Sequence, residues 1–152
     1  MISPNQVLTS EEIKTILNNS EWGVLSTSNN NLPYGVPVNY VYIEEDNTLY
    51  IHGGKEGKKL NNIANNPNVS FTIIPFAKLA PEQFTMKFES VIVYGMAEMV
   101  QDEEDKVNYM YEMCKKLSPE MTEKRGRMVC GQMPAVRIIK VAISEVSGKK
   151  SS

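Results

Sequence analysis

Apolar and polar residues along the chain follow two different periods, and the changes of period predict the order of the elements. Three apolar residues recur at helical spacing near the start: Ile13, Ile16 and Leu17. Thr9 and Glu12 form a capping box that predicts the beginning of this helix, and residues 18–19 end it. Residues 22–28 are typical of a strand, and the turn-rich residues 29–33 follow it.

Apolar and polar residues alternate with a period of two through most of residues 34–52. Four residues of the strand expected at 34–45 share one face: Val36, Val38, Tyr40 and Tyr42. Pro37 interrupts this strand and removes a ladder donor, so we expect either an edge strand or a bulged strand where a ligand fills the gap. Residues 45–47 turn the chain into another strand at 48–52, and such tight turns indicate antiparallel pairing.

Helical spacing returns at residues 55–66, and Pro67 ends the predicted helix. Its apolar face consists of Leu60, Ile63 and Ala64. Strands are expected at 69–76 and 88–100, and Gly95 predicts a bulge or a close backbone approach within the second. Asp102 caps a third helix, whose expected apolar stripe is Val107, Met110, Tyr111, Cys114 and Leu117 or Ser118. In the last strand, 135–146, the alternation of apolar residues shifts near Lys140, which predicts a bulge there. The polar tail 147–152 is expected to be frayed.

This order of elements predicts one mainly β (α+β) domain over residues 1–152, with its core at 9–146. Strands joined by tight turns, without repeated βαβ units, favour a closed or partly closed antiparallel barrel with helices at its rim. The chain has 152 residues, which is the size of one ordinary domain. Apolar residues make up 41% and charged residues 22%, which is typical of a soluble globular protein.

Charge and cysteine content exclude several classes of protein. The net charge is −2, so no basic surface indicates binding to nucleic acid or to an anionic membrane. No segment approaches the roughly 20 apolar residues of a membrane span, and no secretory leader is seen. Cys114 and Cys130 form no CxxC pair, so we expect two reduced thiols in a cytoplasmic protein. One histidine and two separated cysteines cannot build a closed zinc site, and we expect no metal.

The segment most informative about chemistry is 49–60. A strand runs into a glycine-rich loop, and a helix follows that begins with Lys58 and Lys59. Glycines let backbone amides approach an anion, and the helix N-terminus and the lysines add positive charge. This combination predicts a phosphate site, and the alternative is a solvated lysine-rich helix start. His52, the single histidine, precedes the loop; it is either structural or able to face a bound ring, donate a proton or ligate a metal.

These segments, in this order, resemble the pyridoxamine 5′-phosphate oxidase-like superfamily of FMN-binding split barrels, and within it the nitroimidazole-resistance (Nim) branch. The motifs that carry the resemblance are WGVLST, YGVPVNYVY, LYIHGGKEGKKLNNIANNPNVSF, KFESVIVYGMAEMV and AVRIIKVAISEVSGK. They span the chain from about Glu11 to Lys149. The resemblance implies a six-stranded antiparallel split β-barrel with peripheral helices, which forms a homodimer with FMN in each of two interface grooves.

Residues that match the family's flavin contacts fall into four groups: Pro37, Val38, Asn39 and Tyr40; His52 and Gly53; Lys58 and Lys59; Ser90 and Val91. The first group implies the strand whose backbone borders the isoalloxazine ring, and the second lies near the ribityl chain and ring. The third implies the basic pair that binds the FMN phosphate, in agreement with the independent interpretation of the glycine–lysine loop. The fourth implies a contact from the long strand across the dimer. His52 is also the candidate catalytic residue.

The chain departs from its relatives at both ends. It begins MISPNQVL where nitroimidazole-resistance proteins often have an arginine-rich segment. The C-terminal tryptophan and arginine that pyridoxamine phosphate oxidases use for substrate are not evident, which disfavours that reaction. The resemblance therefore implies an FMN-dependent oxidoreductase that reduces a small nitroaromatic (5-nitroimidazole-like) or related electron acceptor. The alternatives are a haem-binding protein with His52 as axial ligand, and a flavin-binding protein without turnover.

Overall fold

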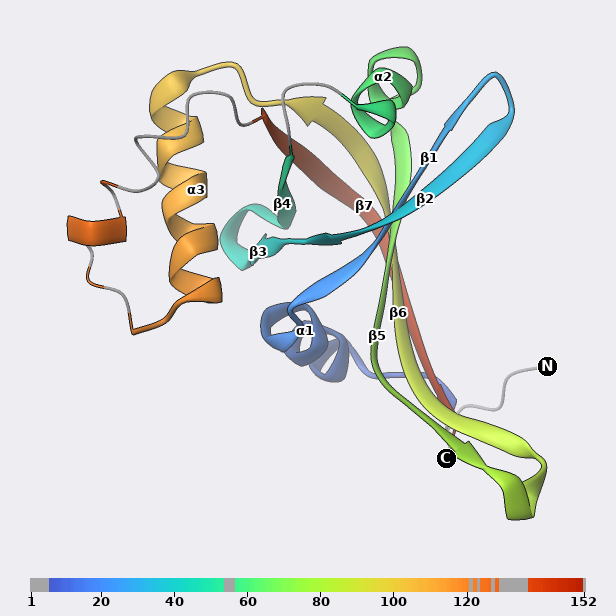
Figure 1. Ribbon diagram of the computed structural model, residues 1–152. Coiled ribbons are helices and arrows are strands. Elements are labelled where there is room, and N and C mark those ends of the chain that lie inside the picture. The colour runs from blue at the N-terminus through green and yellow to red at the C-terminus, as the bar shows by residue number, and fades with distance from the viewer. Residues whose placement is uncertain are drawn as a thin grey trace.

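Figure 1 shows the computed structural model of the chain, which is organised by one strongly curved sheet. The structure describes residues 6–53, 57–120, 122, 124–126, 128 and 137–151. Within these residues the strands are β1 (Trp22–Asn29), β2 (Leu32–Asn39), β3 (Val41–Ile43), β4 (Thr48–Gly53), β5 (Asn68–Ala80), β6 (Thr85–Met99) and β7 (Arg137–Ser151). Their order in the sheet is β2-β1-β5-β6-β7-β4-β3, and every pairing is antiparallel.

The expected six-stranded barrel is corrected to an open sheet of seven strands within the described residues. The two edge strands, β2 and β3, are consecutive in sequence but share no ladder. The expected strand 34–45 divides at Tyr40, whose ring is fully buried and whose hydroxyl donates a hydrogen bond to the Leu17 carbonyl at 2.6 Å. This anchor turns the chain from one edge of the sheet to the other.

The helices are α1 (Ser10–Asn19), α2 (Lys58–Asn65) and α3 (Glu103–Leu117), and 3-10 turns lie at Glu44–Asp46 and Pro81–Gln83. The predicted capping box is confirmed: the Thr9 amide donates to Glu12 Oε1 at 3.0 Å, and the Glu12 amide donates to Thr9 Oγ1 at 3.1 Å. Ile13, Ile16 and Leu17 are buried as expected. They join the main core cluster, which fills the inside of the sheet and includes Leu25, Tyr40, Ile51, Phe71, Val93 and Ile139.

The apolar faces of the other two helices differ in part from the predicted ones. In α2, Leu60 and Ile63 are buried, but Asn62 takes the third buried position and Ala64 is exposed. In α3 the buried residues are Met110 and Met113, which pack with Val41, Tyr50 and Ile138 in a second cluster. Asp102 stands at the N-cap position as predicted, although its side chain makes no capping hydrogen bond. Cys114 packs against this cluster, and Cys130 lies outside the described residues.

The predicted bulge at Gly95 of β6 is confirmed, and the extra residue lies opposite it in β7. Tyr94 pairs with Glu145 and Gly95 pairs with Ile143, so the bulge falls at Ser144 and not near Lys140. The Ser144 hydroxyl donates to the Tyr94 carbonyl at 3.0 Å. The tail is not frayed up to Ser151, because residues 147–151 continue β7 and pair with β6.

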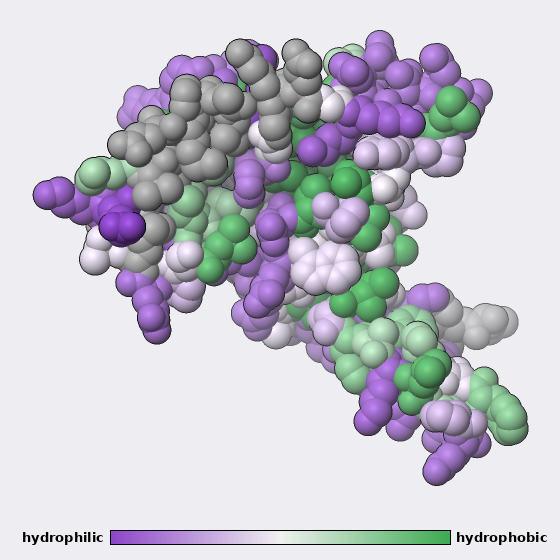
Figure 2. Space-filling model, in the orientation of Figure 1, coloured by the Kyte–Doolittle hydropathy of each residue, from purple (hydrophilic) through white to green (hydrophobic). Residues whose placement is uncertain are grey.

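The hairpin formed by β5 and β6 is longer than predicted and projects from the rest of the molecule (Figure 1). At its tip Phe84 adopts φ of 52° and is 97% exposed. Figure 2 shows hydrophobic residues along this hairpin, and also in a band below α2 where β1, β2 and β5 cross. Within the described residues, no helix is long and apolar enough to cross a membrane.

Candidate functional site

The end of β4 and the beginning of α2 bring together His52, Gly53 and Lys59, which the sequence analysis named as candidate residues. Gly57 is the N-cap of α2 and has φ of 155°, a conformation that residues with a side chain rarely adopt. Lys58 and Lys59 follow as the first helical residues, and the first turn contains no acidic residue. Because the amides of a first turn have no partner inside the helix, this end of α2 offers donors and positive charge to an anion.

Lys59 joins the helix start to the strand end. Its side chain passes over Gly53, where an added Cβ would lie 3.0 Å from Lys59 Cε and 3.1 Å from Lys59 Nζ. The neighbouring residue of β4 is His52, and the Lys59 charge acts on its imidazole. Residue 53 must therefore be small for the ammonium to lie at this position. His52, Gly53 and Lys59 are thus one cluster, as the sequence suggested.

His52 has an unsatisfied polar atom. Its Nδ1 is buried and has no hydrogen-bond partner among the described residues. Burial, and next the positive charge of Lys59, lower the pKa of His52 below its ordinary value of 6.5. The imidazole is therefore neutral at physiological pH, with one nitrogen available for a hydrogen bond to a bound group.

Lys58 turns the other way, toward β2. Its Nζ lies 5.1 Å from the centre of the Tyr34 ring, which is a cation–π distance. Tyr34 was not among the predicted site residues. The signal was present, because Tyr34 continues the alternation of Val36 and Val38 by one step. The contact places one lysine of the pair beside the edge strand and the other beside the end of β4.

Two hydrogen bonds hold α2 against β1. The buried Asn62 amide donates to Thr27 Oγ1 at 3.0 Å, and the Asn66 amide donates to Ser28 Oγ at 3.1 Å. A buried amide that lost its partner would cost about 1–3 kcal/mol, so the first bond also fixes how the helix is oriented. Asn62 was missed because a polar residue on an apolar helical face gives no sign of its partner in another element.

The first group of candidate residues lies at the edge of the sheet. Pro37 and Val38 belong to β2, which pairs with β1 alone, so the prediction of an edge strand is confirmed. Asn39 ends β2, and its amide donates to the Glu21 carbonyl at 3.0 Å. Pro37 and Asn39 are exposed, whereas Val38 packs against the core. The backbone along the outer edge of β2 is thus free of a strand partner within the described residues.

Tyr40 differs from the rest of this group because its side chain belongs to the core. Its ring packs edge-on against Phe71 at 5.1 Å between centroids. Burial raises the pKa of its phenol far above the ordinary value, and a hydrogen bond with Ser20 offsets this only in part. Lys116 from α3 donates to the Tyr40 carbonyl at 2.9 Å. Any contact of Tyr40 with a ligand would therefore be through the backbone.

Ser90 and Val91 are not brought to the other candidates within one chain. Both lie on β6, where they pair with Lys149 and Gly148 of β7. Val91 is fully buried in the core, so its side chain cannot reach a surface ligand. Ser90 is partly exposed on the other face of the strand. A role for this pair would require the backbone, the Ser90 hydroxyl or a second copy of the chain.

The described site fits a phosphate-bearing ligand with a long organic part. Lys58, Lys59 and the start of α2 supply charge-assisted donors for a phosphate, and His52 supplies an unpaired ring nitrogen. The free edge of β2 passes Lys58 at Tyr34 and ends at Asn39. The family resemblance assigns these same residues, except Tyr34, to the binding of a flavin mononucleotide.

Known proteins are similar to this chain in sequence and in fold. Residues 9–150 match the family described as pyridoxamine 5′-phosphate oxidase. No curated protein sequence is significantly similar to the chain. A candidate 5-nitroimidazole antibiotic resistance protein from Bacteroides thetaiotaomicron has a similar structure, with a TM-score of 0.74 and 24% identity over 95% of this chain and 86% of that protein.

Two mycobacterial structures are also similar in fold. A conserved hypothetical protein from Mycobacterium tuberculosis has a TM-score of 0.81 and 18% identity, over 99% of this chain and 89% of that one. The FAD and haem binding protein from Mycobacterium smegmatis has a TM-score of 0.76 and 16% identity, over 97% of this chain and 74% of that one. At these identities the likeness shows a shared fold, and that fold occurs in flavin-binding proteins.

Proposed function

We propose that this chain, which belongs to the pyridoxamine 5′-phosphate oxidase family, binds FMN and uses it to reduce a small electron acceptor. The observation that carries the proposal is the cluster formed by Gly53, Lys59 and His52, with Lys58 on the other side of the helix start. It combines a phosphate cradle with an unpaired ring nitrogen, which are two features that a flavin mononucleotide would use.

Binding of the FMN phosphate would depend on local positive charge, because the chain as a whole is acidic. The net charge is −2, so long-range attraction does not favour a phosphate that carries close to two negative charges. Charge-assisted hydrogen bonds contribute about 1.5–3 kcal/mol each, and two lysines can supply several of them. We assign the phosphate to Lys58, Lys59 and the α2 amides, and the ring to the β2 edge at Pro37–Asn39.

The bound flavin would supply the redox chemistry, since it can take electrons from a reductant and pass them to an acceptor. The chain's own residues would hold it, orient it and control access to it. His52 would offer its buried nitrogen to the flavin, and the neutral form favoured by its lowered pKa keeps that nitrogen able to accept a hydrogen bond. The similarity to a candidate nitroimidazole-resistance protein supports a nitroaromatic acceptor.

The proposal includes a homodimer. On the outer face of the sheet, Tyr94 and Met96 are each about half exposed, and Phe84 and Leu79 are exposed on the hairpin. An apolar surface of this extent is characteristic of an interface between proteins. A symmetric dimer would allow Ser90 of one copy to reach the flavin bound by the other, which is the contact that the resemblance implies. Analytical ultracentrifugation of the flavin-loaded protein should show a dimer, and a monomer at micromolar concentration would contradict this part.

The cofactor is tested by the absorption spectrum of the freshly purified protein and by identification of the released flavin. We expect flavin bands and FMN on chromatography after denaturation. Release of FAD in place of FMN would identify FAD as the cofactor. A haem absorption band that is lost in His52→Ala would favour the alternative in which His52 ligates iron. A colourless protein that takes up neither group on reconstitution would overturn the proposal.

Electron transfer is tested under anaerobic conditions. The flavin-loaded protein is reduced with one equivalent of dithionite, and 2-methyl-5-nitroimidazole is then added. We expect the absorbance of oxidised flavin to return as the nitro group is reduced, and to return more slowly with a non-nitrated imidazole. Binding of FMN without reoxidation by any nitroaromatic would support the non-catalytic alternative.

A further inference from the structure

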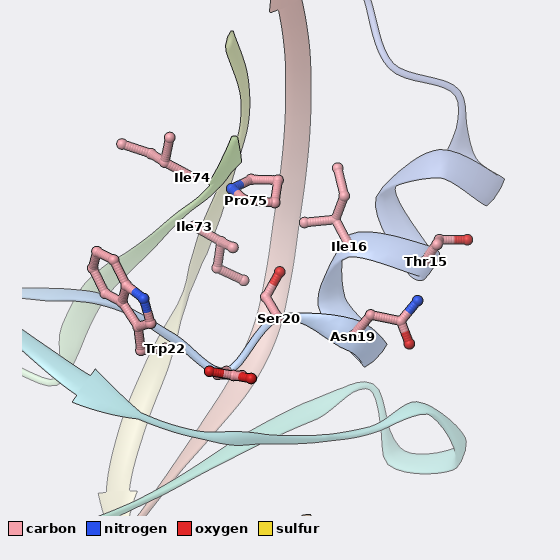
Figure 3. A pocket seen from close by; sticks show the side chains of 9 residues that line it. Thr15, Ile16, Asn19, Ser20, Trp22, Ile73, Ile74 and Pro75 are labelled. Carbon is pink, nitrogen blue, oxygen red and sulfur yellow. The ribbon is translucent and has the colours of Figure 1, made fainter. Parts of the chain in front are cut away.

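A pocket lies between α1 and the sheet, at the opposite end of β2 from the lysines. Its volume is about 390 Å³, and its lining residues come from α1, from the chain between α1 and β1, and from β5. Figure 3 shows Ser20 with its hydroxyl in the space between Ile16 and Ile73, and Trp22 with its indole below Ile74. The lining is mixed: Ile16, Ile73, Ile74 and Pro75 are apolar, Thr15, Asn19, Ser20 and Glu21 are polar, and the half-exposed Trp22 ring forms one wall.

Direct contacts connect this pocket to the end of β2. Trp22 is the ladder partner of Asn39, and the Asn39 amide donates to the carbonyl of Glu21, a second lining residue. The other end of β2 is marked by Tyr34, which is in contact with Lys58. Asn39 is five positions after Tyr34, which is about 17 Å at roughly 3.3 Å per strand residue. The pocket and the phosphate cradle therefore lie at the two ends of one free strand edge.

We infer that this pocket binds the electron acceptor, and that the acceptor is a small, flat, uncharged heteroaromatic molecule. The inference rests on the proposed function, because it needs the redox part of the flavin at Pro37–Asn39 and its phosphate at Lys58 and Lys59. An acceptor held beside Trp22 would then lie next to the ring end of the flavin site and away from the phosphate end.

The lining residues determine which chemical class of ligand the pocket can bind. The Trp22 indole offers a flat face for stacking and one N–H donor, and Ile74 and Pro75 close the other side. The Thr15 hydroxyl already donates to the Glu11 carbonyl at 3.0 Å, so it adds little to ligand binding. The ionisable lining residue is Glu21, whose negative charge disfavours anionic ligands. A neutral ring with a hydrogen-bond acceptor such as a nitro group matches this set.

The test is calorimetric titration of the FMN-loaded protein with 2-methyl-5-nitroimidazole, a probe that needs no turnover. Trp22→Ala removes one wall, and Ile74→Trp fills the pocket from a side chain that is 48% exposed in the native protein. Each change should weaken binding of the probe by about tenfold or more. Leu117→Ala, an equally exposed apolar residue of α3 outside the pocket, is the matched control and should stay within about twofold of wild type.

The affinity for FMN is measured in the same four proteins, so that the two proposals fail separately. We expect FMN to bind all four alike. Unchanged binding of the probe in both pocket variants would overturn the acceptor site and leave flavin binding intact. A parallel loss of FMN and probe would also overturn it, because the pocket would then belong to the flavin site. Failure of wild type to bind FMN would overturn the proposed function itself.

Discussion

Lys59 lies over Gly53, so that a Cβ at residue 53 would stand 3.1 Å from the Lys59 ammonium nitrogen. The contact connects β4 with α2 across the segment between them. It depends on the absence of a side chain at residue 53, and it places a positive charge next to His52. The absence of a side chain at the end of this strand therefore sets the position of the lysine that we propose binds the phosphate.

A side chain at residue 53 should therefore weaken FMN binding through Lys59. Gly53→Val would displace the lysine, whose flexible end can move without disturbing the fold. We expect the affinity for FMN to fall by about tenfold, which corresponds to about 1.4 kcal/mol, with little change in the melting temperature. In a Lys59→Ala background the same change should add little, because residues that act together are not additive. Full additivity in this double-mutant cycle would show that Gly53 acts independently of Lys59.

His52 should titrate below its ordinary pKa, and its signal is easy to assign because the chain has one histidine. Proton NMR should show the ring signal titrating below pH 6.5, the ordinary value, and Lys59→Ala should raise the pKa by removing a positive charge. FMN should also raise it, because the phosphate offsets the Lys59 charge. No change in Lys59→Ala would place the lysine farther from the ring than the structure does.

The same shift has a consequence for stability, and its sign follows from linkage. The folded protein holds His52 neutral, so the unfolded chain binds the proton more readily as the pH falls. The stabilising contribution is complete above the unfolded pKa of about 6.5 and is lost as the pH falls through the folded value. Denaturant unfolding between about pH 7 and pH 5 should therefore show a smaller loss of stability in His52→Gln than in wild type. An identical pH dependence in the two proteins would contradict burial of the neutral ring.

Gly95 should tolerate no larger residue, because its backbone is pressed against the bulge in β7. A Cβ at residue 95 would collide with the Ala142 carbonyl oxygen and come within 3.0 Å of Val141 Cγ1. Gly95→Ala should therefore destabilise the protein by about 1–3 kcal/mol in denaturant unfolding. Gly35→Ala is the matched control, since its Cβ would meet Val24 Cγ1 at an ordinary 3.4 Å. Equal stability of the two variants would show that the sheet relaxes around residue 95.

Local patterns were sufficient to predict most elements, because their causes lie within a few residues. Thr9 and Glu12 satisfy each other's amides, and Pro37 restricts its strand to an edge. The division of 34–45 at Tyr40 could not be predicted, because it depends on a hydrogen bond to Leu17 in another element. The bulge was placed near Lys140 and not at Ser144, because its register is set by Tyr94 and Gly95 across the ladder.

The candidate site was predictable where its residues are adjacent in sequence. His52, Gly53, Lys58 and Lys59 lie in one segment, and the fold keeps them together through the contact of Lys59 with Gly53. Tyr34 and Asn62 were missed, because their roles come from the packing of α2 on β1 and β2. The assignment of Val91 rested on the resemblance alone, and the burial of its side chain limits any contact in one chain to the backbone.

The central claim, that Lys58 and Lys59 bind the phosphate of FMN, is tested by flavin-fluorescence titration of wild type, Lys58→Ala, Lys59→Ala and the double variant. Each single change should weaken FMN binding by about tenfold to a hundredfold, because it removes a charge-assisted contact. Riboflavin, which lacks the phosphate, should bind wild type weakly and respond little to the substitutions. Equal FMN affinity in all four folded proteins would contradict the account and place the phosphate elsewhere.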